Sequence, residues 1–504
     1  MAFRQGGRLG VWQIAHGAEC RVLHHGRVGN RSPWLGHGGP ESLAFHRGLP
    51  VLVSTAGDGA RVWDAVACRE LAHLGTGLTE AALFSPGGDR LYTYGRLGLQ
   101  AWPIESDPSR PREVRIGPPD DIPVPIGAGG FRVNASEDGR LLAVSSHRDG
   151  HAYVLNAKRP SDGLTLADCP KIHSLAFSAD GRWISAGVVD QGIKVWDAAT
   201  GKLLKYFPGL RTFVTFSPDG QWLLGGGPVD YQLWRAGSWE PAEVFPRQHA
   251  DYWAGPAALT RDSRLLALAA NLQQAQLIDF ASRRELATFP AEGVACVAAL
   301  AFDPAGNRLA ISGENHRIRL WDLRAVRRAL HTLQLDWELA DVGSDEPPSR
   351  VVPSITVEQL NFEAELLPFF AAGCDCFVQD MFPWGRNRWS NGYQLVCRGA
   401  AGNHVELEFT VGQAGYRQLA LLSTRGPNAG IFQVALDGED VGGPIDGFDG
   451  GFAPTVSLTV SRQHLDSGPH RLRCTLTGKN PKSGGHEMGI DAIRLTPVSD
   501  GRGS

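Results

Sequence analysis

A pattern that recurs about every forty residues constrains the fold of this chain more than any other feature. Each unit contains an apolar strand, a turn similar to Ser-Pro-Asp-Gly, a second apolar strand and a third strand that often ends in Trp-Asp. The turns occupy residues 46–50, 85–88, 136–139, 178–181, 217–220, 260–263 and 303–306, and the third strands occupy 61–65, 99–103, 152–156, 193–197, 231–235, 276–280 and 318–322. Because each unit joins β-forming residues through turn-forming ones, the sequence predicts seven small sheets.

The spacing of the units is typical of a four-stranded propeller blade. Anchor residues of successive third strands, from Trp12 to Trp321, are 38–53 residues apart. Given this spacing, the turns and the pairs Trp63-Asp64, Trp196-Asp197 and Trp321-Asp322, residues 8–323 resemble WD40-repeat β-propellers. The resemblance implies an all-β, seven-bladed propeller that presents its loops to protein partners.

The units also depart from the pattern of that family. Leu155 and Ile278 replace tryptophan in two third strands, and most units lack an opening Gly-His pair. We therefore expect no His–Asp–Ser–Trp hydrogen-bond network in most blades, and mainly core packing for the tryptophans that remain.

The sequence that follows the last unit predicts a helix in place of an outer strand. Val326, Leu330 and Leu333 share one face at helical spacing, which indicates a helix over 324–338 directly after the strand 318–322.

The N-terminal segment is then expected to complete the last blade. An open ring leaves sheet edges exposed, so residues 19–25 are predicted to pair with 318–322 and close it. The strand at 9–14 is left over, and we expect residues 1–18 to form a surplus partial blade of a propeller domain at 1–323.

A second resemblance concerns the origin of the chain. The segments 102–119 and 320–338 are similar to segments of bacterial proteins that join a serine/threonine kinase domain to WD40 arrays. The resemblance implies that the chain corresponds to the C-terminal part of such a protein, without the kinase domain.

Residues 339–354 are acidic and Pro-rich without periodicity, and we interpret them as a linker. Beyond them the forty-residue pattern stops and alternating strands continue, which predicts a β-sandwich or jelly roll over 355–498 and a short tail at 499–504. The expected strands are 355–365, 404–411, 416–424, 431–438, 455–460, 470–476 and 490–497.

This second domain resembles the galactose-binding and carbohydrate-binding-module-like jelly rolls of bacterial hydrolases and surface proteins. The similarity lies in segments 388–395, 421–448, 468–485 and 488–495. It implies binding, commonly of a sugar, and no catalysis.

The densest mixture of aromatic and polar residues gives the candidate ligand-binding residues. Sugars stack on aromatic rings, and their hydroxyls need amide, guanidinium or carboxylate partners. The candidates are Phe382, Trp384, Arg386, Asn387, Trp389, Tyr393, Asn480 and Asp491. Trp384, between proline and glycine, is expected in a loop. For Trp389 and Tyr393 inward packing is the alternative, and for Asn480 and Asp491 it is turn or strand-end hydrogen bonding.

No catalytic constellation is found, and we expect no enzyme activity, cofactor or metal. The two Gly-Lys pairs lack the rest of a P-loop, and the kinase-like triplet His147-Arg148-Asp149 lacks its accompanying motifs. Cysteines 374, 376, 397 and 474 have the wrong spacing for a zinc ribbon, and packing or thiol exchange suits the first two equally well.

Charge and hydropathy narrow the classes of partner. The formal net charge is -4, so no strong field exists to attract nucleic acid or an acidic membrane. The chain contains no apolar run that suits a membrane span or a signal peptide, which predicts a cytoplasmic location. Two functions remain open, a protein-interaction scaffold and a carbohydrate-binding protein, and the sequence does not fix the partner, the propeller face or the oligomeric state.

Overall fold

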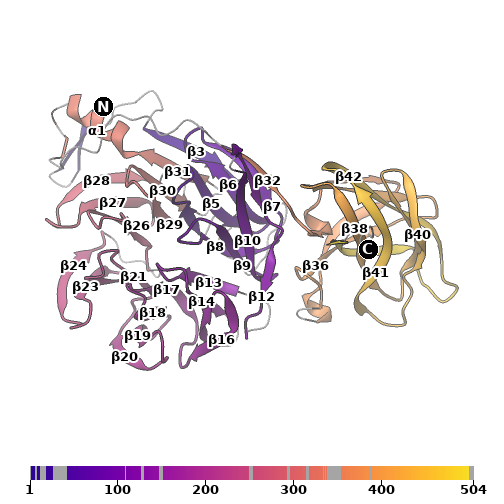
Figure 1. The fold of residues 1–504 in the computed structure, drawn as a ribbon, viewed down its shortest axis with the longest axis horizontal. Coiled ribbons are helices and arrows are strands. Elements are labelled where there is room, and N and C mark those ends of the chain that lie inside the picture. The colour runs from indigo at the N-terminus through magenta and orange to yellow at the C-terminus, as the bar shows by residue number, and fades with distance from the viewer. Residues whose placement is uncertain are drawn as a thin grey trace.

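The computed structural model describes residues 2–5, 8–11, 19–25, 42–107, 109–125, 130–146, 151–248, 254–291, 296–313, 317–332, 334, 336–337, 353–385 and 388–498. Residues 43–322, with a strand from the N-terminal segment, form seven antiparallel blades around a ring, and a second β domain lies beside the ring (Figure 1). The innermost strands of successive blades contact one another in sequence, and the innermost strand of the seventh blade contacts that of the first. The predicted fold class, an all-β propeller followed by a β-sandwich, is confirmed.

The strands of the blades agree with the repeat pattern. Blade 1 has β4 (Leu43–Phe45), β5 (Val51–Ala56), β6 (Gly59–Asp64) and β7 (Arg69–Leu74); blade 2 has β8 (Thr79–Phe84), β9 (Arg90–Gly95), β10 (Gly98–Asp107) and β11 (Arg110–Ile116); blade 3 has β13 (Gly130–Ala135), β14 (Leu141–Ser146), β15 (Ala152–Asn156) and β16 (Arg159–Leu166); blade 4 has β17 (Ile172–Phe177), β18 (Trp183–Val188), β19 (Gly192–Asp197) and β20 (Leu203–Pro208); blade 5 has β21 (Phe213–Phe216), β22 (Trp222–Gly226), β23 (Asp230–Arg235) and β24 (Pro241–Pro246); blade 6 has β25 (Ala257–Leu259), β26 (Leu265–Asn271), β27 (Gln274–Asp279) and β28 (Glu285–Pro290); blade 7 has β29 (Val297–Phe302), β30 (Arg308–Gly313), β31 (Arg317–Asp322) and β3 (Cys20–His24).

The turn at 217–220 recurs in equivalent form in the other blades. Its side chains form hydrogen bonds that stabilise the turn conformation of the backbone. In blade 5 the hydroxyl of Ser217 accepts a hydrogen bond from the Trp222 amide at 2.9 Å and donates one to Asp219 at 2.5 Å. Gly220 closes the turn with φ +73°, a conformation that glycine adopts without steric cost. These turns therefore set where each first strand reverses into the second.

The N-terminal strand closes the ring as predicted. Strand β3 pairs antiparallel with β31, with Cys20 opposite Trp321 and His24 opposite Arg317, and it supplies the outer strand of blade 7. Helix α1 (Leu323–Thr332) follows β31, and its Val326 and Leu330 pack against the core between blades 6 and 7. Leu333 lies outside the described residues.

The surplus strand is not part of any of the seven blades. Strand β2 (Arg8–Val11) pairs with β1 (Ala2–Gln5) in a separate two-stranded sheet, and residues 12–18 lie outside the described part of the chain.

A hydrogen-bond network of histidine, serine and tryptophan is present in blade 1, and it depends on the closing segment. His25 Nε2 lies 2.5 Å from Ser54 Oγ, and Trp63 Nε1 donates to the same oxygen at 2.8 Å. Arg61 lies between His25 and Asp58, with one guanidinium nitrogen 3.2 Å from His25 Nδ1 and 2.7 Å from an Asp58 carboxylate oxygen. Sequence reasoning missed this network because its histidine precedes the first unit by some distance.

Blade 2 has two additional strands. Strand β12 (Asp120–Ile122) pairs with β10, and β32 (Ser354–Val357) adds to the outer strand β11 in parallel. The segment 355–365, predicted to be one strand of the second domain, is therefore divided. Its first part belongs to a propeller sheet, because Ile355 and Val357 pack into the core between blades 1 and 2.

The second domain is a sandwich of two antiparallel sheets with a shared core. One sheet has the order β35 (Asp375–Asp380), β36 (Tyr393–Arg398), β43 (Glu487–Pro497), β38 (Gly415–Arg425) and β41 (Ala453–Leu465), with β33 (Asn361–Glu363) beside β43; the other has the order β34 (Phe369–Ala372), β37 (His404–Val411), β42 (Gly468–Lys479), β39 (Gly430–Leu436) and β40 (Glu439–Asp446). Side chains from both sheets, such as Leu421 and Leu472, are fully buried between them. Two short 3₁₀ turns, η1 (Ala364–Leu366) and η2 (Phe382–Trp384), precede β34 and follow β35.

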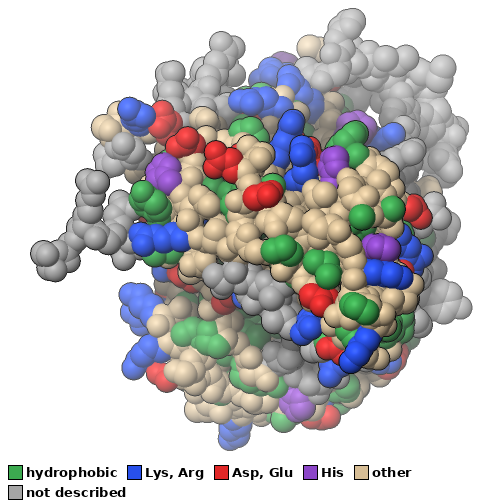
Figure 2. Space-filling view, turned by 90° about the vertical axis from the view of Figure 1, so that its right-hand side faces the viewer, with side chains coloured by type: hydrophobic (Ala, Val, Ile, Leu, Met, Phe, Trp, Pro, Cys, Tyr) green, Lys and Arg blue, Asp and Glu red, His purple; other side chains and the backbone are tan. Residues whose placement is uncertain are grey.

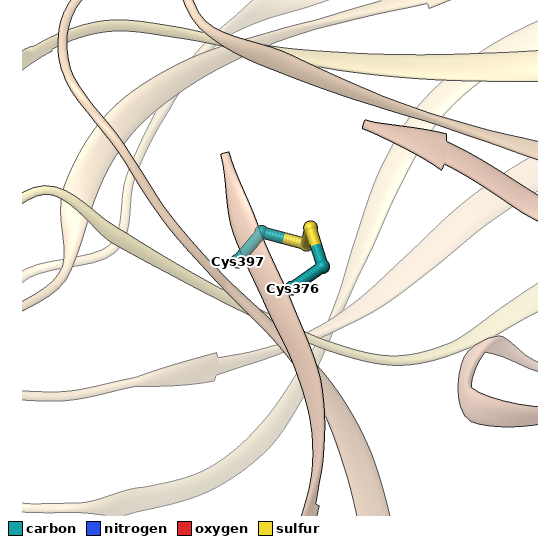
Figure 3. Close-up of a disulfide and its surroundings, with 2 residues drawn as sticks. All are labelled: Cys376 and Cys397. Atoms are coloured by element: carbon teal, nitrogen blue, oxygen red, sulfur yellow. A yellow bond between two sulfur atoms is a disulfide. The ribbon is translucent and has the colours of Figure 1, made fainter. Parts of the chain in front are cut away.

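One disulfide joins neighbouring strands of the sandwich. Cys376 of β35 lies opposite Cys397 of β36 with their Cα atoms 4.2 Å apart, and their sulfur atoms are bonded (Figure 3). Cys374 and Cys474 are free thiols, so the four cysteines do not form one zinc site. Because disulfides persist mainly in oxidising compartments, this bond weakens the expectation of a cytoplasmic location.

Candidate functional site

Two of the predicted ligand residues, Phe382 and Tyr393, contact the propeller instead. Arg96, in the turn between β9 and β10, lies over the ring of Phe382 with its guanidinium carbon 4.4 Å from the centroid, and 5.3 Å from that of Tyr393. Arg96 also donates a hydrogen bond of 2.6 Å to the backbone oxygen of Asn391. The prediction that Phe382 and Tyr393 form an open ligand site does not fit this arrangement, because their ring faces serve a residue of the propeller.

Two further predicted residues are buried inside the sandwich. The Trp389 side chain is buried and its Nε1 donates to Thr424 Oγ1 at 2.6 Å. Asp491 is also buried and accepts hydrogen bonds from the amide and the hydroxyl of Ser390. Both residues therefore stabilise the loop between β35 and β36 from inside the sandwich. This arrangement agrees with inward packing for Trp389 and with structural hydrogen bonding for Asp491.

Trp384 remains the exposed aromatic residue of this loop. It ends the turn η2, is 37% exposed and packs against Phe452, also 37% exposed, with ring centroids 5.3 Å apart. Phe452 closes the loop between β40 and β41, which folds over Gly426. Arg386 and Asn387 lie outside the described residues.

Asn480 lies near the base of that same loop. Its Nδ2 donates to Asp446 Oδ2 at 2.7 Å, and the hydrogen bond lowers the pKa of Asp446. Asp446 also accepts a hydrogen bond from the Phe448 amide at 2.9 Å. The loops after β35, β38, β40 and β42 thus meet at one end of the sandwich, with Trp384 and Phe452 exposed there.

Three carboxyl groups are buried below this end. Ser390 Oγ lies 2.5 Å from a Glu363 carboxyl oxygen and 2.9 Å from one of Asp491, and Asn391 Nδ2 donates to Glu365 at 3.0 Å. Burial, with repulsion from Asp491, raises the pKa of Glu365 to about 7. Burial also raises the pKa of Glu363 well above its usual value, and the charges of Glu365 and Asp491 add to this effect.

Asn391 connects these carboxyl groups to the propeller. Its side-chain oxygen accepts a hydrogen bond of 3.3 Å from the Leu78 amide, while its side-chain nitrogen binds Glu365. Gln359 follows β32 closely in the chain, and its side chain forms two hydrogen bonds with Gly75. Its Oε1 accepts from the Gly75 amide at 3.1 Å, and its Nε2 donates to the Gly75 carbonyl oxygen at 3.0 Å. The two domains therefore share a polar joint in addition to the strand β32.

Glu358 anchors the joint on the other side. Its backbone amide donates to Ile116 of blade 2 at 2.8 Å, and its buried carboxylate pairs with Arg417 of β38 at 3.0 Å. Removing one partner of a buried ion pair leaves an uncompensated charge, so this pair holds the connecting chain firmly to the sandwich.

The propeller has an apolar area of its own on blades 4 and 5. We call the face that contains the loops between blades and the turns between second and third strands the top face. Leu210, between β20 and β21, is 63% exposed, and Val229, between β22 and β23, is 54% exposed. The Arg211–Asp230 ion pair, at 2.6 Å, holds these two segments together. Gly75, Leu78 and Arg96 occupy equivalent positions in blades 1 and 2, so the sandwich docks on this same face.

The surface on the sandwich side of the molecule is mixed (Figure 2). Figure 2, which looks onto the sandwich side of the molecule, shows hydrophobic, basic and acidic side chains interspersed. Among the described residues, no group of three or more His, Cys, Asp or Glu side chains is placed to hold a metal ion. The triplet 147–149 lies outside the described residues. No helix in the described part of the chain is long and apolar enough to cross a membrane.

Comparisons with known proteins agree with the propeller architecture. The family "WD domain, G-beta repeat" matches residues 164–197 and 283–322. Each match starts in or just before the outer strand of one blade and ends with the third strand of the next, the same offset that brings β3 into blade 7. The chain therefore contains WD40 repeats within its propeller, and an additional β domain follows them.

A relative among curated proteins covers part of the chain. Over 214 residues the chain is 22% identical to "THO complex subunit 3" of Arabidopsis thaliana, which is 42% of this chain and 64% of that protein. The match therefore spans slightly less than two thirds of the relative.

Proposed function

We propose that the chain is a non-catalytic interaction scaffold. It binds a protein partner through the top face of blades 4 and 5 and through their outer strands, β20 and β24, which we call the rim. One observation carries the proposal. Of the twelve exposed large apolar side chains in the described residues, six lie on these two blades: Leu203, Leu204, Tyr206, Leu210, Val229 and Val244. A concentration of exposed apolar side chains on one part of a folded protein marks an interaction surface.

Two further facts support the scaffold. A closed ring of seven blades presents loops from a rigid frame, which is how repeat proteins bind partners. The relative is, by its printed name, a subunit of a complex. The predicted origin from a kinase–WD40 protein remains a prediction, and sequencing the gene upstream of this chain tests it.

The experiment uses the full chain as bait in a lysate of the source organism. We compare the wild type with Leu210→Ser/Val229→Ser and with Tyr416→Ser, which changes an exposed aromatic residue of the sandwich. Proteins bound by the wild type and by the control variant, but lost from the double variant, support the proposal. If the double variant keeps its thermal stability and all of its bound proteins, the proposed surface is wrong.

A second candidate function is supported by the exposed pair of Trp384 and Phe452. The two rings lie where four loops of the sandwich meet, and aromatic rings exposed on loops suit stacking on a sugar. Asp446 and Asn480 supply hydrogen-bonding groups from the neighbouring loops. We propose that, if the sandwich binds carbohydrate, it binds at this loop end through Trp384.

A glycan array with the full chain tests this function. Signals that disappear in Trp384→Ala and persist in Tyr416→Ala support it. Absence of any signal from the wild type, or signals that both variants keep, contradicts it.

A further inference from the structure

The outer edge of a blade in this protein already accepts an added strand. Strand β32 joins β11 in parallel, with Glu113 opposite Ser354 and Ile116 opposite Val357. The added residues Ile355 and Val357 pack with Val114 and Ile116, so both backbone pairing and apolar contacts hold the strand.

Strand β20 of blade 4 has the same position, and no strand of the described residues is added to it. The sheet order β17-β18-β19-β20 ends at β20, and an edge strand presents a row of unpaired backbone groups. Leu203, Leu204 and Tyr206 on β20 are 47%, 42% and 43% exposed. Among the outer strands of the described blades, the other large apolar residues exposed to a comparable degree are Val22 on β3 and Val244 on β24.

The charge around β20 is positive. Its sequence from Leu203 to Pro208 contains Lys205 and no acidic residue, and Lys202 directly precedes it. Five of the seven lysines of the chain lie between residues 158 and 205. Of the nearby acidic side chains, Asp168 pairs with Lys194 at 2.7 Å and Asp197 accepts hydrogen bonds from Thr200, while Asp190 is exposed in the turn before β19.

The neighbouring rim of blade 5 is a poorer edge. Strand β24 begins with Pro241 and ends with Pro246, and proline has no amide hydrogen to donate. In β20 proline stands at the last position alone, which leaves residues 203–207 free of it.

We propose that β20 binds an extended segment of the partner as a fifth strand of blade 4, and that this segment alternates aliphatic and acidic residues. Its aliphatic side chains pack on Leu204 and Tyr206, its carboxylates pair with Lys202 and Lys205, and its backbone extends the sheet. The inference rests on the proposed function and specifies the form and chemistry of the partner.

The probe is a fluorescent, acetylated eight-residue peptide of alternating Glu and Ile, measured by anisotropy with the full chain. Wild type is expected to bind it, and Lys202→Glu/Lys205→Glu to bind it at least tenfold more weakly. The charge-reversed variant is expected to prefer a peptide of alternating Lys and Ile. The control Lys482→Glu, which removes an exposed lysine of the sandwich, leaves the affinity unchanged.

Backbone pairing is tested without changing the protein. The same Glu–Ile peptide with alternate amides N-methylated keeps its side chains but cannot extend a sheet, so its affinity is expected to fall at least tenfold. Equal binding of the methylated peptide, no binding of the parent peptide, or no effect of the lysine reversals overturns the inference. If partner capture still depends on Leu210 and Val229 in that case, the proposed function stands; if it does not, both fail.

Discussion

The guanidinium carbon of Arg96, in the propeller, lies 4.4 Å from the ring centroid of Phe382, in the sandwich. The two residues are 286 positions apart, and their contact, with the Arg96–Asn391 hydrogen bond, fixes the sandwich to the top face of blade 2. A ring that the sequence places in a binding loop thus contributes to the joint between domains.

Replacing Arg96 by alanine is expected to loosen this joint. The change removes a cation–π contact of about 0.5–2 kcal/mol and a charged hydrogen bond of about 1.5–3 kcal/mol. Hydrogen exchange at the Leu78 amide, which is bonded to Asn391, should become faster. Arg182→Ala, which removes a cation–π contact with Trp183 inside the propeller, is the control. Unchanged protection of Leu78 in Arg96→Ala contradicts the role of this residue.

Closure of the ring predicts a strong effect of the N-terminal strand on stability. Leu23 is buried between blades 7 and 1, so Leu23→Ala should destabilise the propeller by about 2–5 kcal/mol. Deleting residues 1–25 should lower the unfolding temperature of the propeller further, because edge pairing and closure are both lost. Deleting 1–18 keeps β3 and serves as the control in calorimetry. Equal curves for the two deletions would show that β3 is dispensable.

The two tryptophans of the sandwich loop should respond differently to truncation. Trp389→Ala removes a buried ring and a hydrogen bond to Thr424, and a loss of about 3–5 kcal/mol is expected. Trp384→Ala removes a half-exposed ring that touches Phe452, and a loss below about 1.5 kcal/mol is expected. Thermal unfolding of both variants decides, and the reverse order would remove Trp384 from the proposed ligand site.

The buried carboxyl groups predict that the sandwich is less stable at alkaline than at mildly acidic pH. Since the pKa of Glu365 is about 7 in the folded state, above its usual 4.5, the folded state binds a proton that the unfolded state has lost. This contribution is therefore fully present below about pH 4.5 and is lost as the pH rises through 7. Glu363, Asp491 and Arg494 on neighbouring strands, and Arg96 from the propeller, share this environment.

Glu365→Gln tests this dependence, because the amide is neutral at every pH and still offers an oxygen to Asn391. The variant should gain at least about 1 kcal/mol over the wild type at pH 8 and little at pH 5. Unfolding in urea at both pH values measures the difference. A stability gain of equal size at pH 5 and pH 8 would assign the effect to packing instead of ionisation.

The sequence by itself determined the number of blades, the positions of their third strands and the closure of the ring. These features follow from local periodicity and turn chemistry, which repeat in each unit and are visible without knowledge of distant contacts. Closure was also predictable, since a helix after β31 left one blade without an outer strand and residues 19–25 had the pattern to supply it.

Only the tertiary structure decided which residues of the second domain form its core and which contact the propeller. Three features join residues far apart in the chain: the assignment of residues 354–357 to blade 2, the contact of His25 with Ser54, and the enclosure of Arg96 by Phe382 and Tyr393. The bond between Cys376 and Cys397 depends on the register of two paired strands. Such contacts leave no periodic pattern in the sequence, because any aromatic residue near a turn is equally suited to a ligand, a core or a domain joint. The fold selects among these by bringing one partner, here an arginine of the propeller, within reach.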